Sequence, residues 1–235
     1  MESLMKNIKH FATAAALSLC SFFSQANVIT LDFEDITTYP NGNNVLIQEF
    51  YNGGTSSIGT SGTDYGISFS DNSLLICLNS ATVFCSNTSR GGLAPGSEEG
   101  GLFFLNGSAS IMNVAAGFDT GFSFFYSSIN QAGSVSVFDG LDGTGNTLAT
   151  ISLSGSAGSC PGYSAGFCPF EAIGVAFTGV AQSVSFAGVA NQIVFDDITF
   201  GSVTPGSDPQ VSVPAPASLG LLAATLLGLR LRRKI

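Results

Sequence analysis

The chain has 235 residues, of which only 10% are charged, and its formal net charge is −9. This length suits one large all-β domain, and a hydrophobic share of 45% with 20 Phe excludes a disordered chain. Fifteen of the sixteen acidic residues lie between Asp32 and Asp208, where Arg90 is the only basic residue. A nucleic-acid-binding surface is excluded, because it needs Lys and Arg to neutralise phosphates. The same stretch lacks His and Lys, which excludes His-dependent nucleophilic catalysis, Schiff-base chemistry and His-ligated zinc.

Residues 1–26 predict a secretory signal peptide. Lys6 and Lys9 give a positively charged start, and residues 11–23 form an apolar stretch. Small residues then stand at the −3 and −1 positions of a cut after Ala26. We therefore expect export through the Sec translocon, cleavage by signal peptidase and an oxidising environment for the mature chain.

Residues 27–200 predict an all-β domain, a jelly-roll-like antiparallel β-sandwich. Short apolar runs recur between turn residues about every ten positions, and helical periodicity is missing. Residues 122–126 and 134–138 alternate between apolar and polar side chains, and residues 139–146 (DGLDGTGN) are typical of a hairpin loop. The expected strands are Val28–Phe33, Val45–Tyr51, Gly66–Ser70, Leu74–Leu78, Gly101–Leu105, Ala109–Asn113, Gly121–Ser127, Gly133–Phe138, Thr147–Leu153, Ile173–Phe177, Ser183–Phe186 and Gln192–Phe200.

Four cysteines in this domain fall into two pairs of equal spacing. Cys77 and Cys85 are eight residues apart, and so are Cys160 and Cys168. Four cysteines allow three connectivities, and the repeated spacing favours two local disulfides. Four buried thiols are the alternative, whereas a zinc site would need closer spacing within each pair.

Carboxylates gather near both ends of the domain. Asp32, Glu34 and Asp35 belong to the first expected strand, and Asp196 and Asp197 to the last. Terminal strands of a jelly roll often lie side by side, which would bring five acidic groups together without a basic partner. Such crowding is unfavourable unless the groups are protonated or bind a hard cation, for which carboxylate oxygens are the preferred ligands. Calcium is therefore one hypothesis, and solvated strand ends are the other.

The residues around this last strand resemble a known group of domains. The stretch Ile193–Phe200 (IVFDDITF) is similar to the closing strand of galactose-binding-like jelly rolls and carbohydrate-binding modules. The resemblance implies that the matching Asp residues contribute to a structural calcium site.

Two further features bear on sugar chemistry. Glu98 and Glu99 could serve as glycosidase carboxylates, but neighbouring side chains on a strand point apart, whereas hydrolysis needs two facing carboxyls. The chain has no Trp and five Tyr, so an aromatic platform for a sugar would have to use Tyr, for example in the stretch Thr63–Gly66. A structural role for Tyr at the rim of the sandwich is the alternative.

The end of the chain predicts a polar linker and a sorting segment. Residues 201–212 are polar and contain Pro, and residues 217–229 are an apolar helix too short to cross a ~30 Å hydrocarbon core comfortably. From Val213 onward this end resembles the PEP-CTERM sorting signal of Gram-negative bacteria, in which a Pro motif, a short apolar helix and a basic end follow one another. The matching residues of this motif, with Ala215 where the family has Glu, are Val213, Pro214, Ala215, Pro216, Arg230, Arg232, Arg233 and Lys234.

This resemblance implies transient membrane insertion of the helix, recognition by an exosortase-type enzyme, cleavage near the Pro motif and an exopolysaccharide or biofilm context. We therefore expect a non-enzymatic protein that passes through an inner-membrane-anchored precursor to the outer surface or extracellular matrix. The alternatives are a calcium-stabilised carbohydrate-binding module and, more remotely, a carboxylate-dependent glycan hydrolase.

Overall fold

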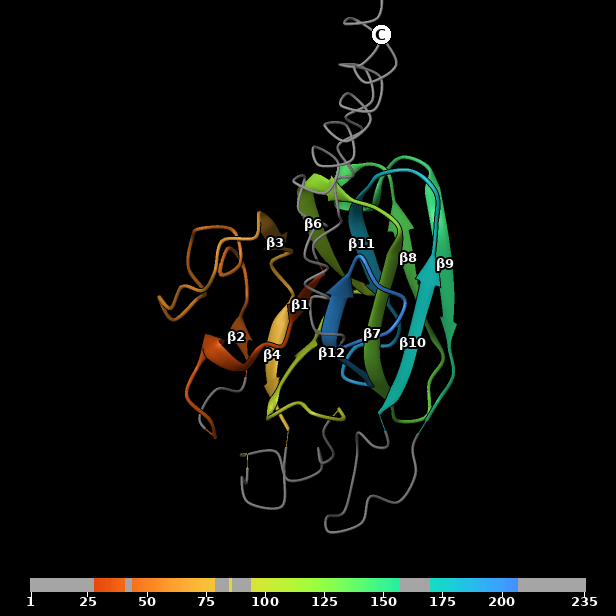
Figure 1. Ribbon diagram of the computed structural model, residues 1–235. Helices are drawn as coiled ribbons and strands as arrows, with labels where there is room; N and C mark the ends of the chain where they lie inside the picture. The colour runs from red at the N-terminus through yellow and green to blue at the C-terminus, as the bar shows by residue number, and fades with distance from the viewer. Residues whose placement is uncertain (1–27, 41–43, 79–84, 86–93, 157–169, 207–235) are drawn as a thin grey trace, which may run out of the picture.

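The computed structural model describes residues 28–40, 44–78, 85, 94–156 and 170–206. Within these ranges the protein is all-β, with twelve antiparallel strands in two sheets (Figure 1). The expected β-sandwich is confirmed. The signal peptide, the sorting segment 213–235 and both Cys160 and Cys168 lie outside the described residues.

The two sheets divide the strands between them. The larger sheet has the order β10-β7-β12-β5-β4-β2, with β1 also paired to β12, and the smaller has the order β3-β6-β11-β8-β9. Two 3-10 turns, η1 (Glu34–Ile36) and η2 (Leu141–Gly143), connect strands. The strands are β1 (Ile29–Leu31), β2 (Val45–Leu46), β3 (Ile67–Phe69), β4 (Leu74–Cys77), β5 (Gly100–Phe103), β6 (Ala109–Phe118), β7 (Gly121–Ser128), β8 (Gly133–Phe138), β9 (Thr147–Leu153), β10 (Glu171–Ala176), β11 (Ala181–Ala187) and β12 (Ile193–Phe200).

Every expected strand has a counterpart, but several expected boundaries are wrong by two to five residues; the strand expected over Ala109–Asn113, for example, continues to Phe118. The second expected strand stops at Leu46, because the chain turns and Gln48 takes a positive φ of 50°. The first stops at Leu31, since Phe33 adopts a left-handed conformation with φ 63° and starts η1. Asp32, Glu34 and Asp35 therefore follow β1 instead of lying on it.

The core between the sheets consists mainly of aromatic rings. The alternation of β7 directs Phe122, Phe124 and Tyr126 into this core, where Phe186 of β11 and Phe195 of β12 meet them. Edge-to-face contacts between these rings have centroid distances of 5.7–6.1 Å, the arrangement that the ring quadrupole favours. All eight residues of β12 are buried, which fits its central place in the larger sheet.

The strand β12 changes partner halfway along its length. Phe195 pairs with Leu102 of β5, whereas Ile198 pairs with Leu31 of β1. Between them the register against β7 shifts, and Asp197 has a positive φ of 46°, the geometry of a β-bulge. The end of β1 and the beginning of β5 consequently meet beside this bulge.

The structure joins Cys77, the last residue of β4, to Cys85 in a disulfide. This is one of the two local bridges that the spacing favoured. In the described residues no helix has the length and apolar character that crossing a membrane requires.

Candidate functional site

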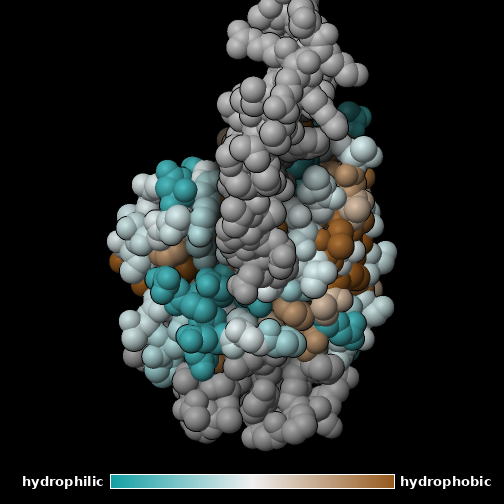
Figure 2. Space-filling model, in the orientation of Figure 1, coloured by the Kyte–Doolittle hydropathy of each residue, from teal (hydrophilic) through white to brown (hydrophobic). Residues whose placement is uncertain are grey.

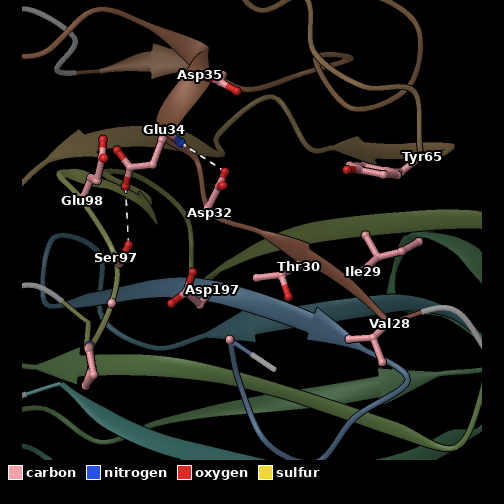
Figure 3. Close-up of a pocket in the computed structure, with 13 residues that line it drawn as sticks. Val28, Ile29, Thr30, Asp32, Glu34, Asp35, Tyr65, Ser97, Glu98 and Asp197 are labelled. Carbon is pink, nitrogen blue, oxygen red and sulfur yellow. Dashed lines mark hydrogen bonds between the residues drawn. The ribbon is translucent and has the colours of Figure 1, made fainter. Parts of the chain in front are cut away.

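A cavity of about 630 Å³ lies where β1, β5 and β12 meet (Figure 3). Five carboxylates line it, together with the backbone of the segment before β5 and the ring of Tyr65. The five are Asp32, Glu34, Asp35, Glu98 and Asp197. We call this space the acidic cavity. None of the described residues is Lys, Arg or His, so no described side chain can offset this negative charge.

Glu34 is the most firmly held carboxylate of the cavity. Its Oε1 accepts a hydrogen bond of 2.9 Å from the backbone N–H of Gly100, and its Oε2 accepts one of 3.1 Å from Glu99. The hydroxyl of Ser97 lies 3.4 Å from Oε1. These contacts fix the η1 turn against the start of β5, and they leave little room at Gly100, where a Cβ would lie 2.7 Å from the carbonyl oxygen of Phe33.

Two tyrosines hold the backbone immediately before Glu34. The Tyr39 hydroxyl donates a 2.8 Å hydrogen bond to the carbonyl oxygen of Phe33, and the N–H of Phe33 donates a 3.2 Å bond to the Tyr51 hydroxyl. Phe33 is fully buried and has the left-handed conformation that non-Gly residues rarely adopt. The two hydroxyls thus satisfy both polar groups of a strained residue and set the direction in which Glu34 points.

Asp196 and Asp197 occupy different places although they are neighbours. Asp197 lines the cavity, whereas Asp196 is fully buried and does not line it. Asp196 accepts a 2.8 Å hydrogen bond from the Ser97 hydroxyl and a 2.7 Å bond from the N–H of Asp197. The bulge at Asp197 separates the two carboxylates in this way.

Burial raises the pKa values of three carboxylates at this site, Glu34, Asp196 and Asp197. The pKa of Glu34 rises to about 7, chiefly through desolvation and further through the charges of Asp32, Glu98 and Glu99. Desolvation and the charge of Asp32 raise the pKa of Asp197 to about 6. Desolvation and then the charge of Asp197 raise the pKa of Asp196 well above its usual range. The folded chain therefore favours neutralisation of these groups.

A divalent cation is one way to neutralise them. Carboxylate oxygens of Glu34, Glu98 and Glu99 lie within 4.8 Å of one another. Oxygens on opposite sides of one Ca²⁺ are about 4.6–5.2 Å apart, given Ca–O distances of about 2.3–2.6 Å. The donors are all oxygen, and no described basic side chain competes for them, so these residues fit a calcium ion.

The structure brings together most of the carboxylates that the sequence singled out. Asp32, Glu34, Asp35 and Asp197 all line the acidic cavity. Glu98 and Glu99 were considered from the sequence for glycan hydrolysis only, and their place beside Glu34 was missed. The signal that could have found them is an acidic pair directly before a strand in a chain with few charges.

Tyr65 is a further residue of the site. Its ring lies across the cavity from Glu34 and Glu98 in Figure 3, remains 38% exposed and stacks on Tyr51 with a centroid distance of 6.3 Å. Tyr65 also lines an adjoining apolar cavity of about 260 Å³ whose walls include Ile67 and Phe118. An exposed ring beside both carboxylates and apolar side chains is a surface that a sugar could stack on.

No protein-family model matches the sequence, and comparison with curated proteins finds no match. Among solved structures, the chain is similar to a glycoside hydrolase family 43 arabinoxylan arabinofuranohydrolase from Bacillus subtilis, determined in complex with cellotetraose. The sequences are 17% identical over the matched region, and the TM-score is 0.35. The match covers 62% of this chain and 30% of that protein.

Proposed function

We propose that this protein is an exported, non-enzymatic β-sandwich of the cell surface or extracellular matrix, stabilised by a calcium ion in the acidic cavity. The observation that carries the calcium proposal is the position of Glu34, which is partly buried against β5 among other carboxylates and has no described basic side chain to pair with. Calcium would join the η1 turn to the segment before β5 through Glu34, Glu98 and Glu99, with Asp32, Asp35 and Asp197 around it. The ion would supply charge neutralisation there.

Export rests on the sequence. Residues 1–26 would direct export as a signal peptide. Residues 213–235 would form a transient inner-membrane anchor that an exosortase-type enzyme removes. A disulfide between Cys77 and Cys85 suits an oxidising compartment. The resemblance to PEP-CTERM proteins supports association with exopolysaccharide.

Calcium titration of the chelator-treated full chain tests the cation. We expect the melting temperature to rise with calcium and the rise to be lost in Glu34→Gln. Glu49→Gln is the matched control, because Glu49 is a carboxylate on the loop after β2 that bonds to exposed Asn52 and does not line the acidic cavity. An unchanged melting temperature in the unsubstituted protein would refute the calcium proposal.

Intact-mass spectrometry of the protein from the outer surface and the medium tests the export proposal. Loss of residues 1–26 and of the C-terminal segment is the expected result. Recovery of an uncut chain from the cytosol would contradict it, whatever the outcome of the calcium titration.

A carbohydrate-binding module is the second candidate, and the exposed ring of Tyr65 beside the acidic cavity favours it. Saturable binding of a neutral oligosaccharide that Tyr65→Ala abolishes would support this candidate. Release of reducing sugar, lost on replacing Glu98 or Glu99, would instead support the remote hydrolase alternative.

A further inference from the structure

The four strands at the ends of the two sheets are protected unequally. The ends of the larger sheet are β2 and β10, and those of the smaller sheet are β3 and β9. In Figure 1, β9 and β10 lie next to each other at one side of the sandwich, while β2 and β3 lie at the other. We call the surface formed by β9 and β10 the open side.

The chain itself covers the outer edges of β2 and β3. At β2, the N–H of Leu46 donates to the Ser57 hydroxyl at 2.9 Å, and the N–H of Ser57 donates back to the Leu46 carbonyl at 3.0 Å. At β3, the N–H groups of Ile67 and Phe69 donate to carbonyl oxygens of residues 51 and 48. The loop that follows β2 thus occupies both edges at this side of the sandwich.

The open side has no such cover among the described residues. There β10 pairs with β7 alone, and β9 pairs with β8 alone. Natural proteins usually protect exposed edges with Lys, Pro or inward-pointing charges. Here β9 (TLATISL) has no charged residue, and β10 (EAIGVA) has only Glu171, which accepts a hydrogen bond from Tyr126 at its first position.

The core is also incompletely covered at the open side. Leu148 and Ala149 of β9, with Ile173 and Val175 of β10, pack against the main core but remain partly exposed. Ala172 and Ala176 are exposed on β10. Figure 2 shows hydrophobic surface on this side of the molecule and hydrophilic surface over the region of the acidic cavity.

The distribution of charge indicates which partner fits. Each copy is strongly anionic, and its carboxylates concentrate at the acidic cavity. Two copies repel each other if they approach through their acidic cavities, and the repulsion is weaker through the open sides, where Glu171 is the one charged residue of β9 and β10. A basic partner would be drawn to the acidic cavity instead. The open side, which carries few charges, is thus the surface suited to self-association.

We propose that the open side pairs with the open side of a second copy, β10 against β10 and β9 against β9, around a twofold axis perpendicular to the sheets. Antiparallel pairing of identical strands about such an axis continues both sheets across the interface. It satisfies the outer backbone groups of β9 and β10 that have no partner among the described residues, and it covers the partly exposed core residues. This proposal depends on neither the cation nor the sorting signal.

Sedimentation of the full chain over a range of concentrations tests the proposal. We expect a monomer–dimer equilibrium that Ala172→Lys together with Ala176→Lys weakens by about tenfold or more in dissociation constant, because the lysines bring like charges together across the pair. Both positions are exposed, so the substitutions leave the fold intact. Thr55→Lys, an exposed position on the loop after β2, is the control and should have no effect.

A charge-swapped pair separates a direct contact from an indirect effect. Ala172→Glu together with Ala176→Glu should weaken self-association as the two lysine substitutions do, and a mixture of the two double variants should restore it as a heterodimer. A monomer at every concentration would overturn the proposal. An unchanged dissociation constant in the double lysine variant would also overturn it. So would the failure of the two double variants to associate when they are mixed.

Discussion

The backbone N–H of Gly100 donates a 2.9 Å hydrogen bond to the carboxylate of Glu34, which joins the end of β1 to the beginning of β5. The two residues are 66 positions apart in the chain. Because a second bond from Glu99 holds the other carboxylate oxygen, Glu34 cannot turn toward solvent without losing both. A partly buried acid is therefore fixed at a place where its charge has no described basic partner.

Glu34→Gln should affect the protein differently with and without calcium. Removing the charge relieves crowding with Asp32 and Glu98, and the amide oxygen can still accept one backbone bond. We expect the calcium-free variant to melt no lower than the unsubstituted protein, and we expect calcium to add less stability to it. Thermal melting with chelator and with added calcium measures both effects. A large loss of stability in chelator alone would show that the role of Glu34 is structural.

The stability of the calcium-free protein should fall as pH rises from about 4 to about 7. The pKa of Glu34 rises from 4.5 to about 7 and that of Asp197 from 3.8 to about 6, so the folded state binds more protons than the unfolded state between these values. Deprotonation of the folded state in this window costs stability, and the cost reaches a plateau above the folded-state pKa values. Urea unfolding at a series of pH values measures the slope, which bound calcium should reduce. A slope of opposite sign would mean that other groups control stability here.

Tyr39→Phe should destabilise the fold by about 1–3 kcal/mol, because the buried carbonyl of Phe33 loses its hydrogen bond. The same change should weaken calcium binding, since Phe33 sets the direction of Glu34. Tyr65→Phe is the matched control: the ring of Tyr65 is partly exposed, and its loss of a hydroxyl should leave the unfolding free energy unchanged. Urea unfolding of the three proteins compares them. Equal effects of the two substitutions would contradict the special role of Tyr39.

Replacing Cys77 and Cys85 together by Ala should lower the unfolding free energy by about 2.5 kcal/mol, the chain-entropy value for a loop of this length. Both residues are buried, so Ala avoids placing a new polar group in the interior. Urea unfolding in oxidising buffer measures the loss. Under reducing conditions the difference between variant and parent should shrink, and an unchanged difference would assign the effect to packing instead of the bond.

The sequence alone determined the class of fold and most of the strands. Alternation and turn residues depend on local spacing, and they placed runs such as 121–127 and 147–153 close to their observed limits. The strand ends at Leu31 and Leu46 were not predicted, because contacts with residues elsewhere in the chain determine the backbone conformation there. Phe33 keeps its left-handed conformation through hydroxyls from Tyr39 and Tyr51, and no local pattern contains that information.

The acidic cavity was likewise predicted only in part from the sequence. Between residues 32 and 208 the chain has fifteen acidic residues and one Arg, so carboxylates without a basic partner were expected. The expectation that the first and last strands pair then identified Asp32, Glu34 and Asp197 as neighbours. Only the tertiary structure shows that Asp196 is buried outside the cavity and that Glu98 lines it. The reason is the bulge at Asp197, where β12 exchanges β5 for β1: a one-residue change of register decides which side chain faces which space, and that register is set by partners far along the chain.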